Sequence, residues 1–500
     1  MSHNIMIQGS MSGVGKSLVT AGLCRVLKED GHKVAPFKSQ NMALNSYITL
    51  DGLEMGRAQV LQAFAAGIEP DVAMNPILLK PNSDVGSQVI VGGEIVGNMS
   101  AAEYFTYKEK LIPSIMEAYE KLRRSYEYII LEGAGSPAEI NLNSDDIVNM
   151  GMAKLVDAPV LLVGDIDRGG VFAQLIGTVM LLSEPERARI RGLIINKFRG
   201  DREILEPGIK MLEEKAGIPV LGVLPYMKLN LEDEDSLTER FKNHNASSDA
   251  GKVDIAVLRL PRISNFTDFD IFESVDKVNL RYVSSVSDFG KPDMVILPGS
   301  KNTMGDLKWL RENGLEKMIK SYADKHPVFG ICGGFQMLGV SIEDPMAIEE
   351  GGHIEGLGLL PIKTVLRSSK KRLRSAGTFK KVSGIFSGLS GLECGGYEIH
   401  VGESEYVEDG NEIISIKDSG NISRDEGCQR GNVYGTYLHG IFDDAKIAHT
   451  VLSSLGKPKG IQIDSGEIHS YGEIREREFS RLSTAVRSCI DMDEIYKILG

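Results

Sequence analysis

Ile5-Met-Ile-Gln-Gly-Ser-Met-Ser-Gly-Val-Gly-Lys-Ser17 is the stretch that decides the fold of the first half of the chain. Its apolar start predicts a strand, and the residues from Lys16 to Glu29 follow a helical pattern, so the glycines fall at a strand-to-helix turn. At such a turn, backbone NH groups and the helix N-terminus can converge on a phosphate. The stretch therefore predicts a phosphate-binding loop at one edge of an α/β sheet.

The loop departs from the standard spacing of such loops. Ser10 stands where the first glycine of G-x4-G-K is expected, and Gly9 comes one residue early. Lys16 would still place its ammonium on the transferred phosphate, and Ser17 its hydroxyl on Mg²⁺. The residues expected to bind ATP here are Ser12, Gly13, Val14, Gly15, Lys16 and Ser17.

Short apolar runs alternate with helical patterns along the first 225 or so residues. The runs at 128–131, 159–163 and 192–195 are rich in β-branched residues and leucine, and amphipathic stretches separate them. Such alternation is typical of a mostly parallel sheet with helices on both faces.

Further ATP and metal groups are expected at the carboxyl ends of these strands. Glu132 directly follows the run at 128–131 and is a candidate Mg²⁺ ligand. Asp51 is a second candidate, although a capping or turn aspartate explains it equally well. Lys38 ends the strand after the first helix and is expected beside the nucleotide.

The stretch Asp165-Ile-Asp-Arg-Gly-Gly170 follows another predicted strand. Its aspartates either cap the helix after Gly170, or Asp167 and Arg168 meet the substrate, with Arg168 as a clamp for a carboxylate or phosphate. The sequence leaves both interpretations open.

A cysteine between a strand and a helix marks the second half of the chain. Cys332 lies in Gly330-Ile-Cys-Gly-Gly334, after the apolar run at 328–331, and its glycines permit the tight turn that exposes a nucleophile. A free thiol is mostly protonated at neutral pH, so it needs a base or a helix N-terminus beside it. His439 ends the predicted strand at 433–438 and is the expected base.

Hydrolysis of an amide through a thioester also needs donors for an oxyanion. The backbone NH groups of Gly299, Ser300 and Gly333 are the expected donors, although a plain strand-to-helix turn also explains the first two.

Composition limits the class of protein. The net charge of −13 argues against nucleic acid as a partner, because cationic side chains drive phosphate-backbone binding. Five scattered cysteines indicate no disulfide framework and favour a reducing cytoplasm. Neither a leader nor an apolar run long enough to cross a membrane is present, so no membrane partner is expected.

We expect two α/β domains, at 1–235 and 252–500, the second with a helical tail, joined by a charged linker at 236–251. Whether the chain forms a homodimer is left open by the sequence.

Several motifs resemble known families. The second half resembles the class I glutamine amidotransferase domain, and the first half resembles dethiobiotin-synthetase-like P-loop ATPases. Taken together, the motifs most resemble the cobyric acid synthase family. They are Gly330-Ile-Cys-Gly-Gly-Phe-Gln-Met-Leu-Gly339, Leu297-Pro-Gly-Ser-Lys-Asn-Thr303, Tyr437-Leu-His-Gly440, Pro36-Phe-Lys-Ser-Gln-Asn-Met42, Glu132-Gly-Ala-Gly-Ser-Pro-Ala-Glu139, Asp165-Ile-Asp-Arg-Gly-Gly-Val-Phe172 and Gly396-Tyr-Glu-Ile-His400.

This resemblance implies an amidoligase that uses ATP, Mg²⁺ and glutamine to amidate the b, d, e and g carboxylates of adenosylcobyrinic acid a,c-diamide. It implies that Asn196 meets the adenine and Asn41 the substrate. One departure from the wider amidotransferase class is that Ile441 replaces the glutamate two residues after the histidine. Whether Glu398, His400 or Glu403 takes its place is open, and Glu398 is the one to test, although the favoured reading of Glu398 is a residue on the strand surface.

Two rival functions remain. The sister enzyme that amidates the a and c carboxylates shares both halves. A ParA- or MinD-like ATPase switch shares only the first, and such switches carry a lysine where this chain has Met11.

Overall fold

A computed structural model describes residues 3–81, 86–140, 146–231, 251–408, 410–418 and 423–500. The chain divides into two compact units. The first consists of Met1–Ala43, Leu53–Asp235 and Arg475–Gly500, and the second of Leu44–Gly52 and Ser236–Ile474. The expected boundaries differ from this division in two segments, 44–52 and 475–500.

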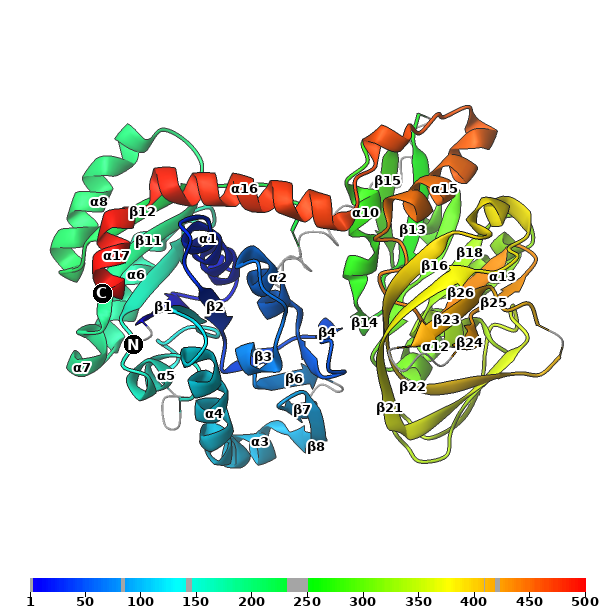
Figure 1. Cartoon of the computed structure of the whole chain (residues 1–500), viewed down its shortest axis with the longest axis horizontal. Coiled ribbons are helices and arrows are strands. Elements are labelled where there is room, and N and C mark those ends of the chain that lie inside the picture. The colour runs from blue at the N-terminus through cyan, green and yellow to red at the C-terminus, as the bar shows by residue number, and fades with distance from the viewer. Residues whose placement is uncertain (1–2, 82–85, 141–145, 232–250, 409, 419–422) are drawn as a thin grey trace. The chain divides into compact units, whose positions relative to one another are not determined.

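The first unit is built on a parallel six-stranded sheet with the order β12-β11-β10-β1-β9-β2 (Figure 1). All of its strand pairs are parallel, so all carboxyl ends lie at one edge. The strands are β1 (His3–Gly9), β2 (Val34–Phe37), β9 (Tyr128–Glu132), β10 (Val160–Asp165), β11 (Ile190–Phe198) and β12 (Val220–Pro225).

Helices cover this sheet, and a smaller sheet adjoins it. The smaller sheet has the order β3-β6-β7-β8, with β3 (Gln40–Met42), β6 (Ile77–Pro81), β7 (Gly86–Val91) and β8 (Glu94–Ser100). The helices are α1 (Lys16–Glu29), α2 (Arg57–Ala65), α3 (Ala101–Tyr107), α4 (Ile112–Arg123), α5 (Met150–Leu155), α6 (Val171–Leu181), α7 (Glu184–Arg187) and α8 (Arg202–Ala216).

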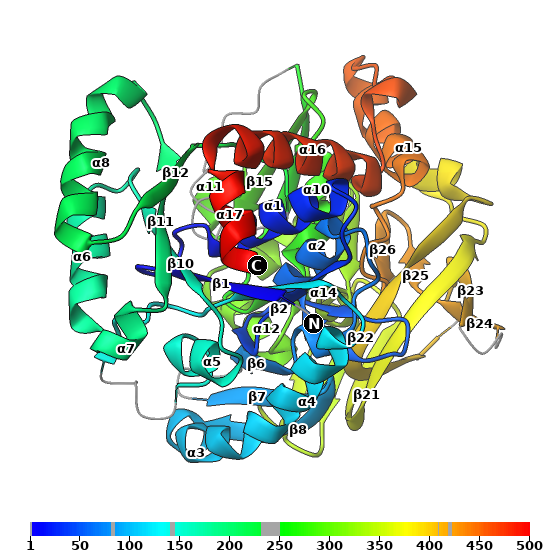
Figure 2. The same ribbon diagram turned by 60° about the vertical axis from the view of Figure 1, so that its left-hand side comes forward.

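The end of the chain completes the first unit. Helices α16 (Tyr471–Cys489) and α17 (Met492–Leu499) bury Phe479, Val486 and Ile495 in the same apolar cluster as α1. This burial explains why the tail belongs to the first unit, and α1 and α16 lie side by side (Figure 2).

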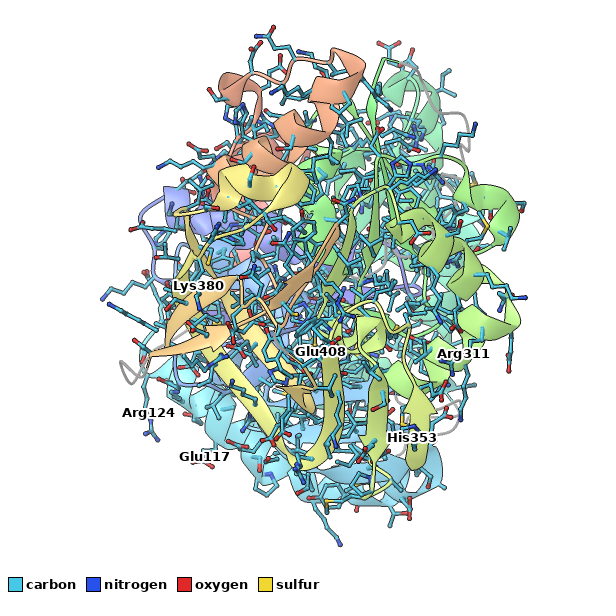
Figure 3. The ribbon with its side chains drawn as sticks, turned by 90° about the vertical axis from the view of Figure 1, so that its right-hand side faces the viewer. Glu117, Arg124, Arg311, His353, Lys380 and Glu408 are labelled. Atoms are coloured by element: carbon cyan, nitrogen blue, oxygen red, sulfur yellow. The ribbon has the colours of Figure 1, made fainter. Side chains whose placement is uncertain are left out.

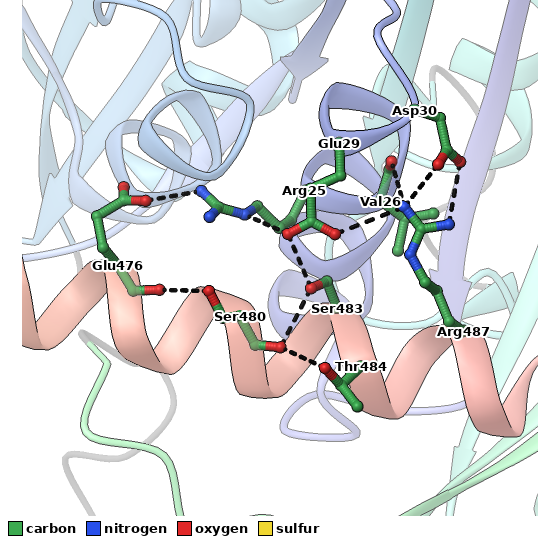
Figure 4. A network of polar contacts seen from close by, with 9 residues as sticks. All are labelled: Arg25, Val26, Glu29, Asp30, Glu476, Ser480, Ser483, Thr484 and Arg487. Atoms are coloured by element: carbon green, nitrogen blue, oxygen red, sulfur yellow. Dashed lines mark hydrogen bonds and ion pairs between the residues drawn. The ribbon is translucent and has the colours of Figure 1, made fainter.

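Polar contacts fasten α16 to the helix that follows the phosphate loop (Figure 4). Arg25 of α1 lies 2.9 Å from Glu476, and Arg487 lies 2.7 Å from Asp30. Arg487 also donates to the Val26 carbonyl at 3.1 Å.

The second unit has its own mostly parallel sheet, with the order β15-β13-β16-β18-β26-β25. Only β25 runs antiparallel. The strands are β13 (Val253–Leu258), β15 (Val278–Val283), β16 (Met294–Leu297), β18 (Val328–Ile331), β25 (Cys428–Arg430) and β26 (Val433–Thr436), and the helices include α12 (Thr303–Glu312), α13 (Leu315–Ala323), α14 (Gly333–Leu338) and α15 (Ala445–Gly456).

A second, largely antiparallel sheet belongs to the same unit. Its strands are β19 (Ser341–Asp344), β20 (Gly352–Glu355), β21 (Ile362–Phe379), β22 (Glu393–Tyr406), β23 (Ile414–Asp418) and β24 (Ser423–Glu426). Ile48, from the short strand β4 (Ser46–Ile48), is buried against Tyr397 and Ile399 of β22. This contact explains why 44–52 belongs to the second unit.

Charged side chains lie at the surface of the second unit, Lys380, Glu408 and Arg311 among them (Figure 3). Lys380 lies 2.8 Å from Asp425, and Arg311 lies 2.7 Å from the less exposed Glu316. Solvent-exposed ion pairs such as Lys380–Asp425 add little stability. Among the described residues, no helix combines the length and apolar character needed to cross a membrane.

Candidate active sites

The predicted nucleophile turn is present in the second unit. Cys332 joins β18 to α14 with φ 51° and ψ −108°, a backbone conformation that side-chain-bearing residues rarely adopt. The turn also needs its glycines, because a Cβ on Gly334 would lie 2.0 Å from the Leu297 carbonyl oxygen. The thiol is buried, and its Sγ lies 3.6 Å from the carbonyl oxygen of Ile399. The strained turn thus holds the thiol at the carboxyl end of the sheet.

His439 lies beside this thiol, and a carboxylate orients its ring. Nδ1 of His439 lies 2.7 Å from Oδ2 of Asp268, whose Oδ1 accepts a hydrogen bond from the Gly440 NH at 3.0 Å. Nε2 lies 3.3 Å from the side-chain amide of Asn265, and the ring stacks on Tyr397. Burial lowers the pKa of His439, but the charge of Asp268 and the neighbouring Cys332 raise it to about 10. The imidazolium is therefore the stable form at neutral pH, next to the Cys332 thiol, and its role as the activating base remains a prediction.

Asp268 is the residue that sequence reasoning missed. It lies in a 3₁₀ turn (Phe266–Phe269), 171 positions before His439 in the chain, so no local spacing connects the two. Asp268 stands between Phe266 and Phe269, and an acidic residue flanked by two aromatic ones was the available signal, because buried carboxylates need a partner.

Glu398, the residue singled out for testing, is engaged elsewhere. Its buried carboxylate lies 3.2 Å from Nζ of Lys371, 3.3 Å from Nε2 of His400, and also binds Arg424. Burial alone would raise the pKa of Glu398, but His400, Lys371 and Arg424 bring it to about 2. Glu403 pairs with Arg367 at the surface. Asp268, not one of these residues, contacts the histidine.

The three expected oxyanion donors lie together around the nucleophile. A Cβ built on Gly333 would lie 2.8 Å from the backbone nitrogen of Ser300, and one built on Gly299 would lie 3.0 Å from Cε1 of His439. The Ser300 hydroxyl donates to Asp306 at 2.6 Å, which anchors the turn. Their role as donors to a substrate remains a prediction.

The phosphate loop of the first unit runs from the end of β1 to the start of α1. Gly13 and Gly15 have φ of 76° and 94°, as the predicted tight turn requires. Nζ of Lys16 donates to the carbonyls of Met11 at 3.3 Å and Gly135 at 3.1 Å. The Lys16 ammonium is thus held by one backbone carbonyl of the loop and by that of Gly135.

Two residues at the end of β11 hold this loop from outside. The Asn196 side-chain amide donates to the Val14 carbonyl at 2.8 Å, and Nζ of Lys197 donates to the Gly13 carbonyl at 2.6 Å. A Cβ on Gly15 would overlap the Asn196 amide nitrogen at 2.2 Å. Asn196 therefore contacts the loop itself, and its contact with adenine remains a prediction.

Glu132 lies at the centre of the same sheet edge, fully buried. Its carboxylate accepts hydrogen bonds from Ser17 at 2.8 Å, Lys38 at 3.0 Å and Gln62 at 2.5 Å. Burial would raise the pKa of Glu132, but the Lys38 ammonium, the Gln62 amide and the Lys16 ammonium hold it below its ordinary value. An ionised carboxylate beside a serine hydroxyl is a set of hard oxygen donors that fits Mg²⁺.

The remaining expected residues have other surroundings. Asp51 is exposed in a turn of the 44–52 segment, which belongs to the second unit, and its role as a metal ligand remains a prediction. Asp167 pairs with Arg199 at 2.7 Å, and its NH donates to Asp165 at 2.8 Å. Asp165 thus closes a local turn at the end of β10, and α6 begins after Gly170 without a side-chain cap, so neither aspartate caps that helix and the capping interpretation is wrong.

Arg168 and Asn41 are the two other residues that were expected to contact the substrate. The Arg168 side chain is half exposed, and its guanidinium lies 3.8 Å from where a Cβ on Gly13 would stand. Asn41 is buried near Gly56. Arg168 thus stands beside the phosphate loop, and both residues remain candidates for substrate contact.

Two family models match the two halves of the chain. The CobQ/CobB/MinD/ParA nucleotide binding domain matches residues 5–237, and the CobB/CobQ-like glutamine amidotransferase domain matches residues 254–447. The predicted fold class is confirmed. A nucleotide-binding unit joined to a Cys-His unit of the amidotransferase type defines a glutamine-dependent amidoligase.

Curated relatives narrow this class. A protein of Ruminiclostridium cellulolyticum named "Cobyric acid synthase" is 55% identical over 100% of this chain and 97% of its own length. One of Lachnoclostridium phytofermentans with the same name is 56% identical over 100% of this chain and 99% of its own length. The chain belongs to the cobyric acid synthase family.

Proposed function

We propose that this protein converts adenosylcobyrinic acid a,c-diamide into adenosylcobyric acid by amidating the b, d, e and g side-chain carboxylates, with glutamine as nitrogen donor. The observation that carries this proposal is the pairing, in one chain, of the Cys332, His439 and Asp268 cluster with the phosphate loop and Glu132. The names of the full-length relatives support the substrate.

The second unit supplies the nitrogen. The Cys332 thiolate attacks the side-chain amide of glutamine, and His439 gives its proton to the departing nitrogen, which leaves as ammonia. The backbone NH groups of Gly333 and Ser300 stabilise the oxyanion, which the closeness of these two residues supports. Water then hydrolyses the thioester, which releases glutamate and restores the thiol.

The first unit activates the carboxylate. Lys16 and the loop NH groups bind the phosphates of ATP, whose γ-phosphoryl group passes to the substrate carboxylate to give an acyl phosphate and ADP. Ser17 and Glu132 would hold Mg²⁺, which neutralises charge on the phosphates. Ammonia then displaces phosphate, and an amide forms for each ATP consumed.

Cys332→Ala tests the division between the units. This variant should lose glutamine-dependent amidation by about 10⁴-fold or more, because the covalent route is gone, and should keep amidation driven by ammonium chloride. Cys394→Ala removes another buried thiol of the same unit and serves as the control. Loss of both activities in Cys332→Ala would refute the two-site scheme.

The product identifies the substrate. Mass spectrometry of the product formed from adenosylcobyrinic acid a,c-diamide should show four added amides. Amidation of cobyrinic acid at two positions, with no reaction of the diamide, would instead identify the sister enzyme.

A further inference from the structure

Three side-chain amides of the first unit keep buried atoms without a hydrogen-bond partner among the described residues. These atoms are Nδ2 of Asn41, Oε1 of Gln59 and Oε1 of Gln62. Gln59 and Gln62 are fully buried, and Asn41 is 3% exposed. Leaving buried polar atoms unpaired is unfavourable, so such atoms at an active-site edge indicate a missing ligand.

The hydrogen bond made by the paired atom of each amide fixes which way the amide group is turned. Gln59 and Gln62 are three residues apart on α2 and share one face of the helix. Both point Nε2 at Oε2 of Glu132, at 3.4 Å and 2.5 Å, and the reverse orientation would place a carbonyl oxygen against an ionised carboxylate. Oδ1 of Asn41 accepts from the Met42 NH at 3.1 Å. The unpaired atoms are therefore one donor and two acceptors.

The donor and one acceptor meet at Gly56. A Cβ at this position would lie 2.7 Å from Nδ2 of Asn41 and 3.0 Å from Oε1 of Gln59. Asn75 holds the Gly56 NH through its Oδ1 at 2.9 Å. Both unpaired atoms are thus buried against Gly56, and no side chain at that position separates them.

We propose that Asn41, Gln59 and Gln62 form the subsite in which the new amide is made, a proposal that rests on the proposed function. Nδ2 of Asn41 donates to the carbonyl oxygen of the acyl phosphate, and the two glutamine oxygens accept N–H groups of the ammonia. An amide offers this pattern: one accepting oxygen and two N–H donors. ATP phosphates and carboxylates carry only accepting oxygens, so they cannot satisfy the glutamine oxygens.

The chemistry at this subsite balances without a further reactant. Ammonia held through its N–H groups keeps its lone pair for the acyl carbon. The C–N bond forms, the C–O bond to phosphate breaks with its electron pair on the phosphate, and one N–H proton passes to that phosphate. Asn41 stabilises the negative charge that develops on the carbonyl oxygen during the attack.

The test uses the full chain carrying Cys332→Ala, with ammonium chloride as the nitrogen source. Gln59→Met, Gln62→Met and Asn41→Leu remove the amides while keeping their approximate size. Thr20→Val is the matched control, since Thr20 of α1 is also fully buried with an unpaired hydroxyl. Two quantities are measured: the KM for ammonium, and positional exchange of ¹⁸O within ATP when corrinoid is present without ammonium. The exchange reports acyl-phosphate formation alone.

We expect both glutamine variants to raise the KM for ammonium about tenfold, because a hydrogen bond to the nucleophile is lost. Isotope exchange should stay near the parent value in Gln59→Met, whose contact with Glu132 is 3.4 Å, and should fall in Gln62→Met, which also loses the 2.5 Å hydrogen bond to Glu132. Asn41→Leu should lower the rate of amide formation about a hundredfold. Thr20→Val should change neither quantity. If a methionine variant does not fold, the corresponding Gln→Asn variant should show the same rise in KM.

Three outcomes would overturn the proposal. Unchanged ammonium KM values in the glutamine variants would refute the subsite. A raised Mg²⁺ requirement with reduced exchange in Gln59→Met as well would assign the amides to the metal site instead. Absence of exchange in the parent would refute the acyl phosphate, and so the proposed function itself, which the first two outcomes leave intact.

Discussion

The thiol site of the second unit and the phosphate site of the first unit both lie at the carboxyl ends of parallel strands. They differ in that the named side chains of the thiol site all find their partners within the protein, whereas those of the phosphate site do not. Cys332, His439 and Asp268 each have a partner from the protein. At the phosphate site, Lys16 is bound to backbone carbonyls, and the amides around Glu132 keep unpaired atoms.

Under the proposed function, this difference follows from what each site binds. Glutamine is small, and its hydrolysis needs a prebuilt nucleophile, base and oxyanion site. ATP, a metal ion and a carboxylate bring many charges of their own, so the phosphate site is complete only when they are present. The comparison predicts that activity at the thiol site depends on contacts within the protein, whereas activity at the phosphate site depends on space for its ligands.

The largest effect is expected from Asp268→Asn, which breaks the completed site. Glutamine hydrolysis should fall by about a hundredfold or more, because the imidazolium loses the charge that holds and orients it. Asp268 and Cys332 together raise the pKa of His439 to about 10, so the parent should keep its general acid up to that pH. Without that charge burial lowers the pKa, and the alkaline limb of kcat/KM should move to lower pH.

Asp270→Asn, two residues away and also buried, is the control for that profile. An Asp268→Asn profile that matches the parent would show that the histidine does not need its carboxylate. Ammonium-dependent amidation should be unaffected in both variants.

A smaller effect is expected from Gly15→Ala, which fills space at the phosphate site. The KM for ATP should rise about ten- to a hundredfold, because a Cβ strains the left-handed backbone and meets the Asn196 amide at 2.2 Å. Glutamine hydrolysis without ATP should stay near the parent rate.

Gly31→Ala is the control that distinguishes backbone strain from the contact with Asn196 as the cause of the effect of Gly15→Ala. Gly31 also has a positive φ, of 90°, but a Cβ there meets nothing within 4 Å. It should leave the KM for ATP unchanged, and an equal rise in both variants would mean that the Asn196 contact is unimportant.

The smallest effect is expected from Arg487→Ala, which removes a support of the phosphate helix. The variant should lose about 1 kcal/mol of local stability in α1 and α16, because a partly exposed ion pair contributes no more than that. Hydrogen exchange of the α1 amides measures the change. Arg477→Ala, on the same helix with its ion pair to neighbouring Glu478, should leave α1 exchange as in the parent.

Local features explain what could be predicted from sequence. The phosphate loop and the Cys332 turn each lie within one strand-turn-helix unit, so glycine spacing and apolar pattern were enough to predict them. Glu132 was predicted as a candidate Mg²⁺ ligand because it directly follows the apolar run at 128–131. The helical tail was assigned to the wrong unit, because its apolar face does not show which core it enters.

The sequence by itself determined the two strand-turn-helix motifs, their order and the family, because each motif encodes its chemistry within a few consecutive residues. Only the tertiary structure decided that Asp268 orients His439, and that Asn41, Gln59 and Glu132 share one buried edge. These groups come from separate segments of the chain, and packing alone brings them together. The physical reason is that a hydrogen bond needs proximity in space, which a linear pattern does not record.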